Sequence, residues 1–191
     1  MLLILINLLN HEVRERYRKK LSVENKKVLL HVGRFSAEKN HLFLIEIMEI
    51  VTKQDDSYVL LLVGNGATEK TVRNIVQMKG LNNKVIFLGV RNDVAELMNA
   101  ADIFLLPSKN EGFGITLIEA QSTGLITFAS DKITKETAIT DLIEYLPIDD
   151  SNIWAEKILL TKINGRDTRN KLIEKKGYSV QVQSKKYIEL V

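Results

Sequence analysis

The sequence predicts an α/β fold, a Rossmann-like doubly wound parallel sheet flanked by helices. Short apolar runs alternate with segments of helical periodicity between residues 28 and 130. The apolar runs are continuous rather than alternating, as expected of strands that are covered on both faces. The connections between them are short, which favours parallel strands joined by crossover helices.

Five strands are predicted from the apolar runs. They are VLLHV at 28–32, YVLLLV at 58–63, KVIFLG at 84–89, DIFLLPS at 102–108 and LITFAS at 125–130. The fourth run ends at Pro107, because proline cannot donate a hydrogen bond to a strand ladder. The first helix is predicted from Leu44, Ile47, Met48 and Val51, which repeat at helical spacing. The following helices carry Val72, Ile75 and Val76, then Val94, Leu97 and Met98, and then the segment 111–124 closed by Gly124.

We divide the chain into a linker segment at 1–25, a Rossmann-like domain at 26–150 and C-terminal helices at 151–191. The helical stretches expected in the last part are 151–163, 168–176 and 179–191, and they are expected to pack on the domain. Strand signals stop after about residue 150.

The opening MLLILINLLN is apolar but only ten residues long and has no basic start. It is therefore too short to span a bilayer and unlike a secretion signal. We expect a linker or the edge of a larger protein, with a short apolar contact to a partner domain or a membrane as the alternative. The basic stretch RERYRKK is expected to be a solvated linker helix rather than a basic binding patch.

Composition excludes several classes of function. Hydrophobic residues make up 45% of the 191 residues and charged residues 27%, which is the balance of a globular domain. The net charge of +3 is too small to indicate nucleic-acid binding, but a few local cations could still hold a small anion. Cysteine is absent, and the three histidines are not spaced as metal ligands. We expect neither a metal nor another cofactor. We expect the protein to be cytoplasmic.

In open α/β sheets, ligands bind outside the carboxyl ends of the strands. The loops GRFSAEKN, GNGATE, GVRND and SKNEGFG follow predicted strands, so we expect them to converge on one rim. The first loop carries Arg34 and Lys39. The guanidinium of Arg34 can donate two parallel hydrogen bonds, and the ammonium group of Lys39 is a compact positive charge, so the pair suits a diphosphate. We interpret Asn65 and Gly66 as a turn rather than as ligand contacts. Val90 and Arg91 could offer backbone contacts to a base.

The segment EGFGITLIEA at 111–120 carries the strongest functional signal. Glycines let a ligand approach the backbone closely, and the first turn of a helix favours an anion. Glu111 precedes that helix and could accept hydrogen bonds from sugar hydroxyls. Glu119 lies within it, where a carboxylate is costly unless a group such as a ribose hydroxyl pair donates to it. The alternative is that both acids only complement the helix dipole.

Five segments in this order, HVGRFSAEKN, LLVGNG, VIFLGVRNDV, ADIFLLPSKNEGFGITLIEAQSTG and LITFAS, resemble one family. They are similar to the donor-nucleotide half of the retaining glycosyltransferases with the GT-B fold, the glycosyltransferases group 1. The resemblance covers about residues 12–190. Its most specific piece is the Glu-x7-Glu segment formed by Glu111 and Glu119, preceded by Gly-Arg-x4-Lys at residues 33–39.

The resemblance implies a role for each candidate residue. Arg34 and Lys39 would bind the diphosphate and stabilise the leaving nucleotide, Glu111 would hold the donor sugar, and Glu119 the ribose. Arg34, Lys39 and Glu111 are thus the candidate catalytic residues. The remaining donor-binding candidates are Gly33, Asn65, Gly66, Val90, Arg91, Gly112, Phe113, Gly114, Ile115 and Thr116. No metal is implied, because the basic pair and the helix dipole would stabilise charge.

The sequence departs from the family pattern after the Glu-x7-Glu helix. Gly124, Leu125 and Ile126 replace the usual Gly-x-Pro, and DKITKETAI replaces a glycine-rich segment, with Glu136 the counterpart of the family's acid. The half of the family fold that binds the acceptor has no counterpart in these 191 residues. Alone, the chain is therefore expected to bind a donor but to transfer sugar poorly or not at all.

The resemblance implies transfer of a hexosyl or N-acetylhexosaminyl group from a nucleotide-diphosphate sugar, most simply a UDP-sugar. The acceptor would be a glycan or a lipid-linked molecule, in bacterial exopolysaccharide or capsule synthesis. Peripheral association of the full-length protein with the inner face of the membrane would follow from such an acceptor. The alternatives are a nucleotide-sugar 2-epimerase-like enzyme of the same fold and a non-catalytic nucleotide-sugar-binding module.

Overall fold

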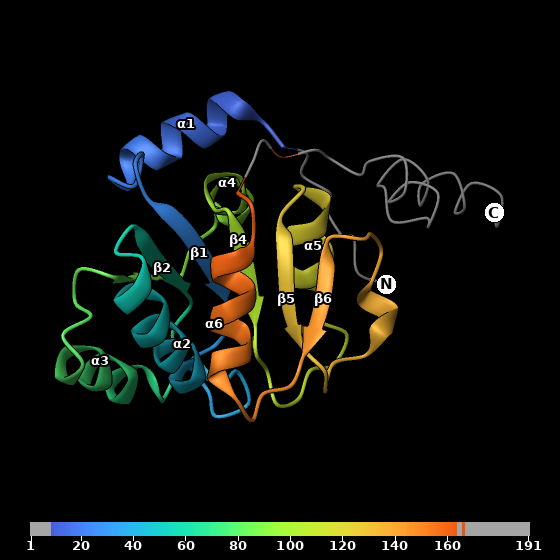
Figure 1. Cartoon of the computed structure of the whole chain (residues 1–191). Coiled ribbons are helices and arrows are strands. Elements are labelled where there is room, and N and C mark those ends of the chain that lie inside the picture. Colours follow the sequence, from blue (N-terminus) through green and yellow to red (C-terminus); the bar gives the residue numbers. More distant parts are fainter. Residues whose placement is uncertain (1–8, 164–165, 167–191) are drawn as a thin grey trace, which may run out of the picture.

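The computed structural model describes residues 9–163 and residue 166. Six parallel strands form one sheet in the order β3-β2-β1-β4-β5-β6 (Figure 1). The strands are β1 (Lys27–Val32), β2 (Tyr58–Val63), β3 (Val85–Gly89), β4 (Ile103–Leu106), β5 (Ile126–Ser130) and β6 (Ile143–Leu146). The order reverses between β1 and β4, so their carboxyl ends flank the crevice in which such sheets bind ligands.

Helices cover both faces of the sheet (Figure 1). On one face lie α2 (His41–Gln54), α3 (Glu69–Met78) and α6 (Ser151–Leu160), and on the other α1 (His11–Lys20), α4 (Val94–Ala100) and α5 (Ile115–Ser122). A short 3-10 helix, η1 (Lys135–Thr137), lies between β5 and β6. Within the described residues, every helix is too short or too polar to cross a membrane.

The continuous apolar runs are explained by two hydrophobic cores. Successive strand side chains point to opposite faces, so Leu29 packs in the core beneath α2 and α6, while Val28 and Leu30 pack in the core beneath α4 and α5. All six residues of β2 are buried for the same reason. A doubly wound parallel sheet, as predicted from these runs, is therefore confirmed.

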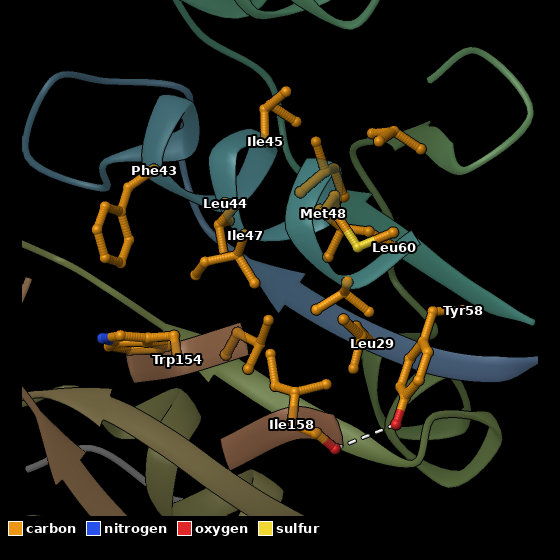
Figure 2. Close-up of a cluster of buried hydrophobic side chains, with 14 of the residues drawn as sticks. Leu29, Phe43, Leu44, Ile45, Ile47, Met48, Tyr58, Leu60, Trp154 and Ile158 are labelled. Atoms are coloured by element: carbon orange, nitrogen blue, oxygen red, sulfur yellow. Dashed lines mark hydrogen bonds between the residues drawn. The ribbon is translucent and has the colours of Figure 1, made fainter. Parts of the chain in front are cut away.

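The core between α2 and α6 is anchored by aromatic side chains (Figure 2). Trp154 is fully buried and meets Phe43 edge to face, with 5.7 Å between the ring centroids. The hydroxyl of Tyr58 donates to the carbonyl of Ile158 at 3.1 Å, which satisfies its polar end inside the core (Figure 2). The first of the predicted C-terminal helices is thus confirmed and packs on the domain, while 168–176 and 179–191 lie outside the described residues.

The sixth strand was not predicted. Strand β6 is only four residues long, with Glu144 exposed between partly buried neighbours, and it forms the edge of the sheet beside β5. An edge strand with one half-solvated face does not produce a continuous apolar run. The five predicted strands are confirmed, with bounds that differ by up to two residues at an end.

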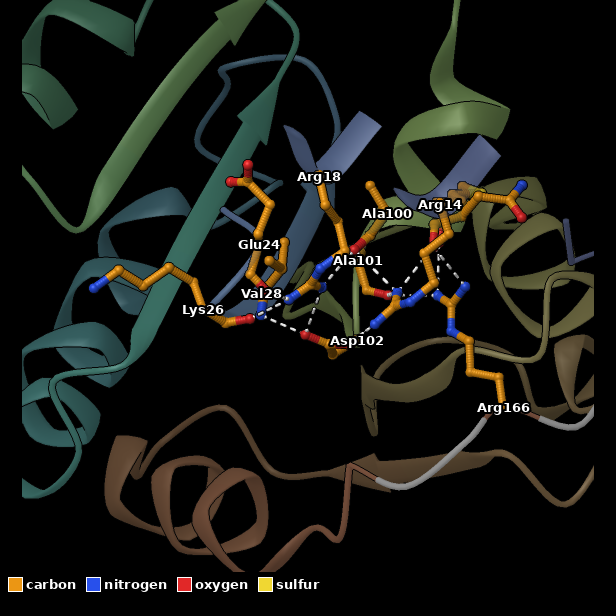
Figure 3. Close-up of polar contacts among 11 residues, drawn as sticks. Arg14, Arg18, Glu24, Lys26, Val28, Ala100, Ala101, Asp102 and Arg166 are labelled. Carbon is orange, nitrogen blue, oxygen red and sulfur yellow. Dashed lines mark hydrogen bonds and ion pairs between the residues drawn. The ribbon is translucent and has the colours of Figure 1, made fainter. Parts of the chain in front are cut away.

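Helix α1 was expected as a solvated linker helix, and this is wrong for the face that meets the domain. The guanidinium of Arg14 donates to the carbonyls of Asn99, Ala100 and Ala101 and pairs with Asp102 (Figure 3). Arg18 reaches the same carboxylate at 3.2 Å. Long basic side chains therefore dock α1 where α4 ends and β4 begins, instead of pointing into solvent.

Arg166 closes this arginine cluster, which consists of Arg14, Arg18, Arg166 and Asp102. Its guanidinium donates to the carbonyls of Met98, Asn99 and Ala101 at 2.6–3.0 Å (Figure 3). Burial, and secondarily the charge of Arg14, lowers the pKa of Arg166 to about 9. The cluster holds two segments far apart in the sequence against one end of α4.

Candidate functional site

The loops that follow the strands converge on one rim, as predicted. Gly33 donates its backbone N–H to the carbonyl of Val63, and Gly64 donates to that of Gly89. Across the switch point, the N–H of Lys109 donates to the carbonyl of Glu38 at 2.7 Å. These backbone hydrogen bonds fix the loops after β1, β2, β3 and β4 beside one another.

Two glycines allow these loops to pack closely. A Cβ atom on Gly64, whose φ is +131°, would lie 2.2 Å from the carbonyl oxygen of Gly33. A Cβ on Gly66 would lie 2.4 Å from that of Phe35. Asn65 between them accepts a backbone hydrogen bond from Phe35 at 2.8 Å. Asn65 and Gly66 lie in the irregular segment directly before a turn at residues 67–68, so the turn expected from them is displaced by two residues. A donor contact from them stays a prediction.

The central feature of the rim is an ion pair between Lys39, in the loop after β1, and Glu111, in the loop after β4. Ser108 also donates its hydroxyl to the Glu111 carboxylate, at 2.7 Å. The Glu111 side chain is 9% exposed, so its charge is balanced by this pair rather than by water. The pair thus joins the loops that follow β1 and β4, the two strands between which the sheet order reverses.

Arg34 is exposed on the same loop as Lys39 and, among the residues that the structure describes, has no ion-pair partner. A guanidinium in this position is available to an anion at the rim. Arg91, by contrast, donates to the carboxylate of Asp93, with 2.7 Å between Nε and Oδ1. Val90 beside it is 67% exposed and lies at the surface.

The helix α5 begins at the rim, with Gly114 as its N-cap in the left-handed conformation at φ +64°. No atom lies within 4 Å of the position that a Cβ on Gly112 would occupy, so a ligand can approach the backbone there. Phe113 is 39% exposed. Together, residues 112–116 present a glycine-rich turn and the first N–H groups of a helix, which is suited to an anion.

Glu119 lies in the second turn of α5, and side chains on a helix lean toward its N-terminus. Burial raises the pKa of its carboxyl group above the ordinary value. Within the described residues, this carboxylate accepts no hydrogen bond that would offset that burial. A ligand group at the rim that donates two hydrogen bonds to Glu119 would offset the free-energy cost of burying this carboxylate.

Beneath the first loop lies a cluster of three rings, formed by His31, Phe35 and His41. The ring of His41 stacks on Phe35 with 4.0 Å between centroids and meets His31 edge to face at 4.7 Å. The Nδ1 of His31 bonds the carbonyl of Leu105 at 2.9 Å, so it carries the proton. His31 also lies against Gly33, which fits its expected structural role near the rim.

Both buried histidines make folding sensitive to acid. Burial lowers the pKa of His31 to about 4, and burial together with the neighbouring His31 and Lys39 lowers that of His41 to about 3. Since the unfolded-state pKa is near 6.5, the unfolded chain binds more protons below that pH. We expect the free energy of unfolding to fall between pH 7 and pH 5 by about 2 kcal/mol per histidine.

Urea unfolding at the two pH values measures this effect. The His41→Phe variant keeps a stacked ring without a titrating group, so its fall in stability should be about half that of the wild-type chain. Equal stability of the wild-type chain at pH 7 and pH 5 would contradict the burial of two neutral histidines.

Residues 13–176 match the sequence profile of the family described as glycosyl transferases group 1. The chain belongs to this family. It is 30% identical, over 185 residues, to the UDP-Gal:alpha-D-GlcNAc-diphosphoundecaprenol alpha-1,3-galactosyltransferase of Escherichia coli, covering 87% of the chain and 46% of that protein. The group 1 chain thus spans under half the length of this relative.

Solved structures agree on the fold. WaaG, a glycosyltransferase involved in lipopolysaccharide biosynthesis, superposes with a TM-score of 0.70 at 28% identity, over 78% of this chain and 42% of WaaG. The C-terminal domain of the group 1 protein LpcC from Francisella tularensis superposes with a TM-score of 0.74 at 20% identity, over 92% of this chain and 97% of that domain. The fold of the group 1 chain is therefore the Rossmann-like fold of GT-B glycosyltransferases.

The structure brings most of the candidate residues of this group 1 chain to the rim, and their roles in donor binding stay predictions. Glu136 lies apart from α5 in sequence, exposed on η1. Ser108 was missed, although its position three residues before Glu111 in a post-strand loop could have indicated it. Within the described part of the chain, no three His, Asp or Glu side chains gather as a metal site.

Proposed function

We propose that this chain is the donor-binding half of a retaining glycosyltransferase that uses a UDP-sugar. The observation that carries the proposal is the pairing of Lys39 with Glu111 across the switch point, beside the glycine-rich start of α5. A cation for the diphosphate and a carboxylate for the sugar thus stand together at one rim. Family membership supports the same assignment.

The geometry supports a separate set of contacts for each part of the donor. The diphosphate would lie at the first turn of α5, with Arg34 and Lys39 neutralising the charge that grows as the nucleotide leaves. Glu111 would then exchange its bond to Lys39 for bonds to sugar hydroxyls. Glu119, one turn further along α5, would accept hydrogen bonds from the two ribose hydroxyls. The backbone at Val90 would contact the base.

The reaction would transfer a hexosyl or N-acetylhexosaminyl group, with the acceptor attacking from the face that the nucleotide leaves. Configuration at the anomeric carbon would be retained. The galactosyltransferase of E. coli supports a UDP-sugar donor and a lipid-linked acceptor, because its name specifies both. Surface polysaccharide synthesis at the inner face of the membrane fits these chemistries. Reaction without metal or other cofactor stays part of the proposal.

Replacement of Glu119 tests the placement of the ribose. In the Glu119→Ala variant, UDP affinity should fall by about 1–3 kcal/mol, roughly 5- to 150-fold, because two hydrogen bonds to a buried carboxylate are lost. Isothermal titration calorimetry with UDP and 2′-deoxy-UDP measures the effect. The wild-type chain should prefer UDP, and the variant should bind both nucleotides with similar affinity.

The exposed Glu156 on α6 provides a matched control, since Glu156→Ala should leave both affinities unchanged. A wild-type chain that binds UDP and 2′-deoxy-UDP equally would rule out the ribose role of Glu119. The rest of the proposal would then rest on the phosphate contacts alone.

A further inference from the structure

The loop between β3 and α4 reaches the rim but has little backbone bonding of its own. The carbonyl of Gly89 accepts the N–H of Gly64 at 2.8 Å, which fixes the end of β3 beside the loop after β2. Among the described residues, the N–H groups of Val90, Arg91 and Asn92 donate to no backbone carbonyl. The conformation of this loop therefore depends on side-chain contacts.

Asp93, the last residue of the loop, gathers these contacts. One oxygen of its carboxylate accepts the Nε of Arg91 at 2.7 Å, and the other accepts a terminal guanidinium nitrogen of the same residue, so the pair is bidentate. The hydroxyl of Tyr17, on α1, donates to the second oxygen at 2.9 Å. The hydrogen bonds from Arg91 and then from Tyr17 lower the pKa of Asp93 to about 2, which keeps the carboxylate charged. One charged group thus joins the loop to α1.

Asp93 is also the N-cap residue of α4, but its side chain makes no capping hydrogen bond to that helix. Aspartate is among the preferred N-cap residues, because its carboxylate can accept an N–H of the first turn. Here the carboxylate bonds Arg91 and Tyr17 instead. The local stabilisation of α4 is replaced by a contact that joins residues 76 positions apart.

Helix α1 is a firm support for this contact, because it is attached near both ends of α4. Arg14 and Arg18 donate to carbonyls at the C-terminal end of α4 (Figure 3), while Tyr17 bonds Asp93 at the N-terminal end. The Tyr17 side chain is 9% exposed and packs in the core beneath α4, where Leu97 is also buried. The Tyr17 hydroxyl is therefore a fixed point against which the loop is held.

We propose that Tyr17 is a positioning residue for the nucleotide base: through Asp93 it holds Arg91, and with it the loop backbone that the base would contact. This assignment rests on the proposed function, in which the base lies at Val90. It makes α1, which the sequence indicated only as a linker, a part of the donor site. A loop that is already ordered loses less conformational entropy when the base binds than a loop that must first become ordered.

Calorimetric titration with UDP and ADP tests this role. In Tyr17→Phe, which removes only the hydroxyl, the Kd for UDP should rise about two- to ten-fold. The weaker binding of ADP should stay the same, because it depends on the shared ribose and phosphate contacts. Asp93→Asn should have the same effects, because it removes the charge that holds Arg91. Asp93 is partly exposed, so this variant remains informative even if Tyr17→Phe fails to fold.

Tyr58→Phe is the matched control. The Tyr58 hydroxyl is also buried and donates to the carbonyl of Ile158, but it lies at the start of β2, at the opposite end of that strand from the rim. Tyr58→Phe should lower the free energy of unfolding in urea and leave both Kd values unchanged. If Tyr17→Phe behaves in the same way, with lower stability and an unchanged Kd for UDP, its hydroxyl is only structural and the positioning role is wrong.

Failure of the proposed function gives a different result. A wild-type chain that does not bind UDP, or that binds UDP and ADP equally, contradicts the base contact itself and the role of Tyr17 with it. A wild-type chain that prefers UDP, together with Tyr17→Phe and Asp93→Asn variants that keep the full preference, overturns the role of Tyr17 alone.

Discussion

Replacement of Lys39 by alanine is expected to lower the rate of sugar transfer by the full-length protein about 10²- to 10³-fold. This is the effect of removing one charged or hydrogen-bonding group that stabilises a developing anion. Lys39 is the cation that the structure holds at the switch point, and its pairing with Glu111 keeps it at the rim before a donor binds. Arg34→Ala should have an effect of similar size, because its guanidinium is exposed on the same loop.

The rate is measured as release of UDP, with a donor sugar and acceptor saturating for the wild-type enzyme. Lys53→Ala serves as the matched control, because Lys53 is in the last turn of α2 and its side chain is 70% exposed in a pair with Glu49. Its rate should equal that of the wild type. Unchanged transfer rates in both Lys39→Ala and Arg34→Ala would contradict the proposal that these residues stabilise the leaving nucleotide.

Replacement of Asp102 by alanine is expected to destabilise the chain by about 3–5 kcal/mol, the usual effect of leaving a buried charge without its partner. The Asp102 side chain is 3% exposed and pairs with Arg14 and Arg18. It also accepts the backbone N–H of Val28 at 2.7 Å. Its loss would leave three guanidinium groups, including that of Arg166, close together without the carboxylate (Figure 3).

Urea unfolding at pH 7 measures the change, with Asp131→Ala as the control. Asp131 pairs with Lys132 at 3.3 Å on the surface, and exposed pairs of this kind contribute below about 1 kcal/mol. An Asp102→Ala variant within about 1 kcal/mol of the wild type would mean that the carbonyls at the end of α4 hold the arginines without the carboxylate.

The sequence predicted the elements whose burial is uniform. Strands β1, β2 and β4 are apolar on both faces, so their runs are visible without knowledge of their neighbours. Strand β6 was missed because its burial depends on β5, to which it is paired only in the folded chain. The arginine cluster was missed for a similar reason. The contacts of Arg14 and Arg18 with residues 99–102 join positions 82–88 apart, and Arg166 lies 65–68 positions from the carbonyls it bonds.

The position of the candidate site was predictable, but its internal bonding was not. Glycines and charged residues after each strand indicated the rim, because parallel strands end at one edge. The ion pair of Lys39 with Glu111 joins residues 72 positions apart, and the sequence indicated only that both lie at that edge. The buried pair of His31 and His41 was also invisible, since ring contacts depend on how the loop after β1 folds back.

Donor binding by this chain is tested most directly by a calorimetric titration with UDP, with GDP and ADP as comparisons and Arg34→Ala as the paired variant. We expect saturable binding of one UDP per chain, weaker binding of GDP and ADP, and loss of UDP binding in the variant. No saturable heat with UDP at millimolar concentration, or equal UDP binding by the wild-type chain and Arg34→Ala, would contradict this expectation.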